Sequence, residues 1–288
     1  MTTENMINKM FTVNSLKKII GEQNNRIYKR TVSSVIEPKN EVSTNLDALK
    51  IVYKYMSKNH RNEYFYKNTL INKILLGRHS VRTSTAIREL PILNNILDLL
   101  IINGIGQVYE IKTGLDNLLR LQDQLNAYYM VFSYCNVVTD VSHLSAVKEL
   151  LAKTPTGIIL LTNRDTLHVE KEAVEFNDKL NSRTMFNVLR KYEFENILMS
   201  EYGILPETTQ SKYYEACFEL FERINLKKSQ EYMLKELKKR NPIDETNYKQ
   251  FKNVPKEIKS LVYFSDYKNK EYNELNDFLE SKYIKGDS

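Results

Sequence analysis

Apolar residues recur every three or four positions between Leu46 and Leu76, as in Leu49, Val52 and Met56. This spacing predicts two helices that are separated near residues 59–62. Residues 1–45 instead mix Asn, Thr, Ser and Lys with short apolar patches, so we expect a weakly ordered basic arm there.

The pattern changes to short apolar stretches after residue 83. Strands are expected at 84–90, 96–102, 107–112, 135–139, 157–162 and 166–170. The Asn103-Gly104-Ile105-Gly106 turn joins the second and third strands into a hairpin. Helices are expected at 115–132, 144–152 and about 181–199, followed by helical segments with breaks at Asn241-Pro242 and near Pro255.

These elements define the expected fold class, an α/β domain over 46–200 with a mixed central sheet flanked by helices. A helical C-terminal region over 201–288 is expected to follow it. The core order is helix, strand, strand, strand, helix, strand.

Composition and charge narrow the class of protein. The net charge is +6, and residues 1–84 hold 15 Lys and Arg against 6 Asp and Glu, which suits a polyanion partner as well as a merely solvated surface. Two isolated cysteines and no long apolar run favour a cytoplasmic protein without a membrane span. The four histidines lack metal-ligand spacing, and neither GxSxG nor GxxxxGK[ST] occurs.

The hairpin carries the candidate chemistry. Its turn places Asp98 opposite Glu110 or one step away, and the period of two sends Glu110 and Lys112 to the same face. Two close carboxylates are unfavourable unless a positive charge lies between them. Mg²⁺ or Mn²⁺ would suit these oxygen ligands, with the Ile111 carbonyl as a further one, whereas a structural ion pair is the alternative.

Polar residues follow on the next predicted helix. Asp116, Arg120, Gln124 and Tyr128 stand four positions apart, so they form a row that ends at the border of the apolar stripe. An ordinary solvated face would explain Asp116 and Arg120, whereas Gln124 and Tyr128 suit contacts to substrate phosphates, with packing of the helix onto the sheet as the alternative. The basic segment 72–82 suits phosphate contacts or plain solvation.

Asp98, the EIK of 110–112 and the QLNAY of 124–128 resemble the PD-(D/E)XK nuclease superfamily, in its RecB-like branch with a QxxxY helix. The run VYEIKTGLDNLLRLQDQLNAYYMVF is similar to a small orphan group of stand-alone bacterial and phage proteins of that superfamily. The resemblance covers about residues 60–200, although Leu97 precedes Asp98 where the superfamily's name has proline.

The resemblance implies a restriction-endonuclease-like core and a metal-dependent phosphodiesterase. Asp98 and Glu110 would hold Mg²⁺ or Mn²⁺, Lys112 would orient or polarise the attacking water, and Gln124 with Tyr128 would contact the substrate. Many members carry one more glutamate on a helix before the first strand, and here Glu63 at the start of the second helix and Glu89 on the first strand compete for that place.

The expected activity is therefore hydrolysis of nucleic acid, DNA in preference to RNA. Two alternatives stay open. One is a non-catalytic module that binds nucleic acid or a protein, and the other is an RNA-cleaving toxin or a phage-defence nuclease.

Overall fold

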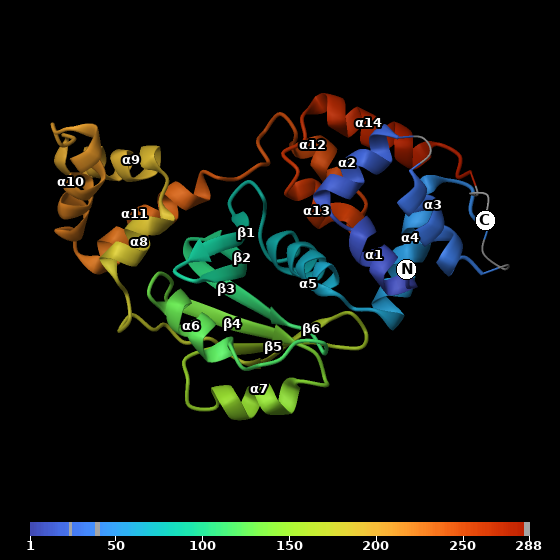
Figure 1. The fold of residues 1–288 in the computed structure, drawn as a ribbon, viewed down its shortest axis with the longest axis horizontal. Helices are drawn as coiled ribbons and strands as arrows, with labels where there is room; N and C mark the ends of the chain where they lie inside the picture. The colour runs from blue at the N-terminus through green and yellow to red at the C-terminus, as the bar shows by residue number, and fades with distance from the viewer. Residues whose placement is uncertain (23–24, 38–40, 285–288) are drawn as a thin grey trace. The chain divides into compact units, whose positions relative to one another are not determined.

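The computed structural model describes residues 1–22, 25–37 and 41–284 and divides the chain into two compact units (Figure 1). Unit 1 combines both ends of the sequence, residues 1–78 and 242–288, whereas unit 2 is the continuous segment 79–241. The boundaries between the two units therefore fall after residue 78, in the basic segment 72–82, and at the Asn241-Pro242 break. They differ from the expected boundaries at 45 and 200.

Unit 1 is helical, and its helices come from both ends of the chain. The N-terminal segment forms α1 Thr3–Met10, α2 Val13–Gly21, α3 Arg26–Val35, α4 Asn45–Asn59, α5 Glu63–Leu70 and the π-helical turn η1 Ile71–Leu75. The C-terminal segment adds α12 Tyr248–Asn253, the 3-10 turn η2 Lys256–Ile258, α13 Lys259–Tyr263 and α14 Asn269–Glu280.

The first three helices correct the expectation of a weakly ordered arm. Thr2, Thr12 and Asn25 cap them by accepting a hydrogen bond from a main-chain N–H. Helix α3 packs against α1 and α4, and α14 packs against α2 and α4. These helices have only 8–10 residues, so their apolar stripes are short. Helices of this length are marginal alone, and packing against the other helices of unit 1 stabilises them.

The central element of unit 2 is a six-stranded mixed sheet in the order β1-β2-β3-β4-β5-β6. Strand β3 is antiparallel to β2 and parallel to β4, β4 is parallel to β5, and the two edge pairs are antiparallel. The predicted strands are confirmed to within two residues: β1 Thr85–Ile92, β2 Asn95–Asn103, β3 Ile105–Lys112, β4 Tyr134–Thr139, β5 Gly157–Leu161 and β6 Leu167–Lys171.

Unit 2 also contains six helices. They are α6 Leu121–Tyr129, α7 Leu144–Leu151, α8 Ser182–Val188, α9 Lys191–Tyr202, α10 Gln210–Glu222 and α11 Leu226–Lys238. Of these, α6, α7 and α8 contact the strands. Helix α7 contacts β5, whereas α8 to α11 pack on one another and α8 reaches β1 (Figure 1). The mixed α/β class is therefore confirmed, while the expected C-terminal helical region is shared between the two units. No helix in the described ranges is long and apolar enough to cross a membrane.

Two helix predictions need correction. Helix α6 begins at Leu121 and not at Leu115, because the Asp116 carboxylate accepts hydrogen bonds from the N–H and hydroxyl of Thr113 (2.8 and 2.9 Å) and closes a turn. The helix expected at 181–199 is two helices, since Leu189 and Arg190 between α8 and α9 have extended backbone.

Candidate functional site

The β2–β3 hairpin has the predicted register. Leu99 faces Tyr109 and Asn103 faces Ile105, so the next position toward the open end of the hairpin places Asp98 across from Glu110. Gly104 makes the turn in the left-handed region, with φ of 76°, which glycine adopts without strain. The local sequence alone therefore brings the two carboxylates together.

Glu110 and Lys112 form a buried ion pair at the end of β3. Only 1% of the Glu110 surface is exposed, and Lys112 Nζ donates to Glu110 Oε1 at 2.7 Å. The same ammonium donates to Gln124 Oε1 on α6 at 2.9 Å. A charge buried this deeply is costly without such partners. We refer to Asp98, Glu110, Lys112, Gln124 and Tyr128 as the carboxylate centre.

Asp98 is half-buried and contacts the main chain of β3. Its Oδ2 accepts a hydrogen bond from the N–H of Ile111 at 2.7 Å, which ties the carboxylate to the residue between Glu110 and Lys112. The carbonyl of Ile111 as a metal ligand stays a prediction. In the described parts of the chain, no group of three or more His, Cys, Asp or Glu side chains is arranged to hold a metal ion. The available carboxylates are therefore a pair.

Tyr128 lies behind Glu110. Its hydroxyl is 2.9 Å from Glu110 Oε2 and 3.0 Å from the Ile96 carbonyl, and its side chain is fully buried. Burial raises the pKa of Tyr128, and the charge of Glu110 raises it further, so the phenol stays protonated and donates. Tyr128 therefore orients Glu110. Gln124, the other α6 residue of the carboxylate centre, is half-buried and lies nearer to solvent than Tyr128.

Asp116 and Arg120 do not continue the helical row. Both are exposed and precede α6 in the chain, and Arg120 Nη2 reaches Asn95 Oδ1 only at 3.4 Å. The Asp116 carboxylate instead binds Thr113. The expected row of four is thus reduced to Gln124 and Tyr128, and substrate contacts of Asp116 and Arg120 stay predictions.

The structure separates the two candidates for a further glutamate. Glu63 begins α5 in unit 1, where it pairs with Lys67 at 2.5 Å. Arg88 faces Leu99 and Leu90 faces Leu97, so Glu89 occupies the position across from Asp98. Glu89 is exposed and has a φ of 53°, a left-handed backbone that non-glycine residues adopt mostly where structure or function demands it. Glu89 is therefore the candidate that shares the sheet with Asp98.

A loop that the sequence patterns do not single out lies beside the carboxylate centre. The Asp140 carboxylate accepts from the Gly114 N–H at 3.1 Å, and His143 Nε2 is 2.8 Å from the Asp116 carbonyl. These contacts join the loops after β3 and β4. The sequence carries a signal for this loop, since Asp140 follows β4, which is parallel to β3, and parallel strands end at one sheet edge.

Cys135 lies in β4 and is buried. Burial raises the pKa of its thiol, which fits an inert cysteine.

The fold and the site define an α/β protein in which one hairpin of a mixed sheet holds two carboxylates, Asp98 and Glu110, and the Lys112 ammonium. The family model described as bacteriophage P4 protein cII matches residues 56–265, and the chain therefore belongs to that family. Protein cII of Enterobacteria phage P4 is 27% identical over 188 residues, which cover 62% of this chain and 64% of the phage protein. The match thus spans less than two thirds of that relative. No solved structure shows significant similarity.

Proposed function

We propose that this member of the phage P4 cII family is a metal-dependent nuclease that hydrolyses phosphodiester bonds, with DNA as the preferred substrate. The observation that carries the proposal is the position of the Lys112 ammonium, which Glu110 and Gln124 hold together while Asp98 lies across the hairpin. The order α5, β1, β2, β3, α6, β4 also agrees with the expected core order, which supports a restriction-endonuclease-like core.

The side chains present fit a hard divalent cation. Mg²⁺ is commonly bound by one or two carboxylates, with water and substrate phosphate as its other ligands, so Asp98 and Glu110 suffice as a protein contribution. When bound, Mg²⁺ or Mn²⁺ would lower the pKa of a water and stabilise charge on the phosphate. Glu89 is the further carboxylate of the same sheet.

The remaining residues have separable roles. Tyr128 fixes the Glu110 carboxylate from behind through its hydroxyl. Gln124 and Glu110 hold Lys112 in one rotamer, so that its ammonium is in place to orient a water or neutralise a phosphate oxygen. Gln124 has an amide nitrogen in addition to the oxygen that Lys112 occupies, and this nitrogen is a donor for substrate.

A second candidate is the non-catalytic module that binds nucleic acid or a protein. One observation favours it: both Glu110 oxygens already accept hydrogen bonds, from Lys112 and from Tyr128. A buried carboxylate satisfied in this way is also what a purely structural ion pair requires. The two candidates differ in whether a divalent cation changes anything at this pair.

The deciding experiment incubates the purified full chain with labelled linear, circular and single-stranded DNA and with RNA, each with Mg²⁺, Mn²⁺ or EDTA. Glu110→Gln removes the charge while keeping the size of the side chain, and Asp123→Asn does the same at an exposed position of α6. We expect metal-supported cleavage that EDTA and Glu110→Gln abolish and Asp123→Asn retains, with melting curves as the check on folding.

Two outcomes would change the conclusion. Cleavage of RNA alone would move the protein to the RNA-cleaving alternative. Binding of nucleic acid without cleavage under every metal condition, together with unchanged Mn²⁺ binding in Glu110→Gln, would leave the non-catalytic module as the function.

A further inference from the structure

Unit 1 carries the positive charge of the protein. Its two segments, residues 1–78 and 242–288, hold 22 Lys and Arg against 15 Asp and Glu, whereas unit 2 holds 20 against 21. The carboxylate centre therefore lies in the unit that has no excess of positive charge. A surface that attracts a polyanion is expected in unit 1.

Helix α4 of unit 1 presents a row of lysines to solvent. Lys50, Lys54 and Lys58 stand four residues apart, and all three are exposed. Val52 and Met56 follow Lys50 and Lys54 by two positions, which is about 200° around a helix, and both are completely buried. The lysines therefore lie in the middle of the solvent-facing side of α4. We call them the lysine row.

The lysine row has no carboxylate partners. In the ranges that the structure describes, none of its three side chains forms an ion pair. Asp47 lies one turn before Lys50, but its carboxylate caps α4 by accepting from the Thr44 N–H at 3.0 Å. Elsewhere a lysine is paired with a glutamate four residues away, as Lys191 is with Glu195 in α9. Like charges at that spacing destabilise a helix slightly, so α4 keeps a repulsion that such pairing avoids.

The neighbouring helix α3 adds to this positive charge. Arg26 and Arg30 also stand four residues apart and are exposed, and neither forms an ion pair within the described part of the chain. Helix α3 packs against α4 (Figure 1). Charges of one sign on adjoining helices act together on a charged partner, so the two helices form one basic region of unit 1.

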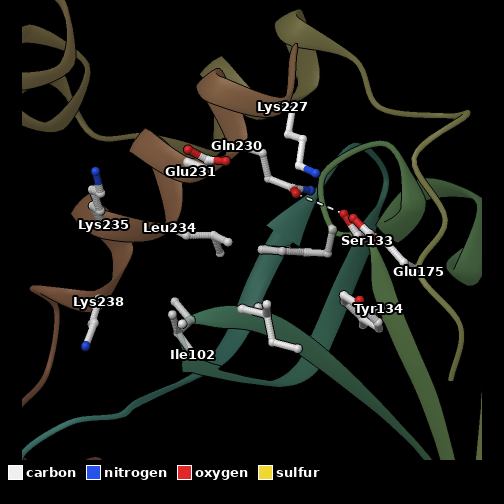
Figure 2. A pocket seen from close by; sticks show the side chains of 14 residues that line it. Ile102, Ser133, Tyr134, Glu175, Lys227, Gln230, Glu231, Leu234, Lys235 and Lys238 are labelled. Atoms are coloured by element: carbon white, nitrogen blue, oxygen red, sulfur yellow. Dashed lines mark hydrogen bonds between the residues drawn. The ribbon is translucent and has the colours of Figure 1, made fainter. Parts of the chain in front are cut away.

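Lysines of unit 2 have a different setting. A pocket of about 530 Å³ lies between the β2–β3 hairpin and α11, at the other end of β3 from the carboxylate centre (Figure 2). Lys227, Lys235 and Lys238 line it together with Glu175 and Glu231 (Figure 2). Carboxylates therefore stand among these ammonium groups, whereas the lysine row has charge of a single sign.

The chemistry of the lysine row favours one kind of polyanion. Its three ammonium groups extend over two helical turns, about 12 Å, which suits a chain of phosphates better than a single anion. Helix α4, which the structure describes in full, has no exposed large apolar side chain of the kind that enters a membrane surface. It also has no exposed aromatic ring on which the bases of a single strand could stack. A duplex, with its phosphates outside and its bases inside, fits these features.

We propose that the lysine row of unit 1 binds the phosphate backbone of duplex DNA without reading its sequence. This surface is separate in the chain from the carboxylate centre of unit 2. The choice of DNA over RNA rests on the proposed function, but the binding itself requires no cleavage. Such a contact would retain the protein on DNA while the carboxylate centre binds and releases it.

The test measures binding of the full chain to a short labelled DNA duplex by fluorescence anisotropy, in EDTA and at several salt concentrations. The triple variant Lys50→Gln, Lys54→Gln and Lys58→Gln removes three charges with residues that form helices equally well. We expect it to bind the duplex at least about tenfold more weakly at low salt. The slope of log K against log salt should fall by about 2 to 3, because each phosphate contact releases counterions.

A matched triple variant removes the same charge from unit 2. Lys153→Gln, Lys212→Gln and Lys227→Gln change three exposed lysines there, and we expect the slope to stay nearly unchanged. The melting temperature of the α4 variant should equal or exceed that of the unchanged chain, because a repulsion between like charges is removed. Lys54→Gln alone should lower the slope by about one, which keeps the test valid if the triple variant misfolds.

The proposal is overturned if the α4 triple variant keeps the slope of the unchanged chain, or if the two triple variants lose affinity equally. Tighter binding of the unchanged chain to a single strand of the same length, or to vesicles that contain phosphatidylserine, would also overturn it. Because binding is measured in EDTA, absence of cleavage in Mg²⁺ would leave this result intact. Loss of the expected salt effect with cleavage retained would contradict only the lysine row.

Discussion

The two ends of β3 differ in how much of their polar chemistry is satisfied within the protein. At the carboxylate centre, Lys112 and Glu110 are buried and each has two partners. In the pocket between the β2–β3 hairpin and α11, Lys235 and Lys238 are exposed, whereas the apolar lining residues Ile102, Phe132 and Leu234 are buried. A substitution of the buried Glu110 or Lys112 should therefore change stability and activity together, whereas a substitution of an exposed lysine in the second region should leave the free energy of unfolding nearly unchanged.

The largest loss in the free energy of unfolding should come from Glu110→Ala. The variant leaves the Lys112 ammonium, which is 9% exposed, without its carboxylate, and breaking a buried pair typically costs about 3–5 kcal/mol. Lys235→Ala, at an exposed position, should change the free energy of unfolding by less than about 0.5 kcal/mol. Denaturant unfolding of both variants measures the difference.

A double variant checks the cause of that loss. Glu110→Ala combined with Lys112→Met removes both charges, so it should recover part of the stability. A double variant no more stable than Glu110→Ala would mean that packing and not charge dominates, and the contrast between the two ends of β3 would lose its electrostatic basis.

Tyr128→Phe should have the next largest effect. It removes the hydroxyl donor from the buried Glu110 carboxylate, and an unsatisfied buried group costs about 1–3 kcal/mol. Tyr134→Phe, at the half-buried first residue of β4, is the matched control and should change the free energy of unfolding by less than about 0.5 kcal/mol. Similar melting temperatures for both variants would contradict the assignment of Tyr128 as a support for Glu110.

Gln124→Ala should act on substrate more than on folding. Loss of one neutral hydrogen bond, worth about 0.5–1.5 kcal/mol, should raise the substrate concentration for half-maximal cleavage roughly two- to twelvefold. Gln122→Ala, at an exposed position of the same helix, should leave it unchanged. A lower melting temperature with intact substrate affinity would withdraw Gln124 from the site.

The smallest effect is expected for Arg120→Ala. The side chain is exposed and has one long contact to Asn95, so stability should change by less than about 0.5 kcal/mol. If Arg120 contacts one phosphate, the slope of log K against log salt should fall by about one. An unchanged slope would confine the substrate contacts to the carboxylate centre.

The sequence predicts the carboxylate centre because its geometry is local. A glycine turn and a period of two suffice to bring Asp98, Glu110 and Lys112 together, and the six strands follow from equally short patterns. The start of α6 differs from the predicted one because the Thr113–Asp116 turn competes with the helix. The pocket between the β2–β3 hairpin and α11 could not be predicted, since it requires α11 to pack on a hairpin more than 100 residues earlier in the chain.

The two ends of the chain meet in unit 1, which has a consequence for the order of folding during synthesis. The Asn45 N–H donates to the Ser281 carbonyl at 3.1 Å, and the Tyr283 N–H donates to the Ser43 carbonyl at 3.0 Å. In unit 2, by contrast, Asn241 Nδ2 reaches the Val81 carbonyl at 2.6 Å, so that unit closes on its own contiguous segment. The N-terminal helices must therefore wait for a ribosome to add roughly 160 intervening residues, about 8–30 s at typical rates, before their C-terminal partners are made.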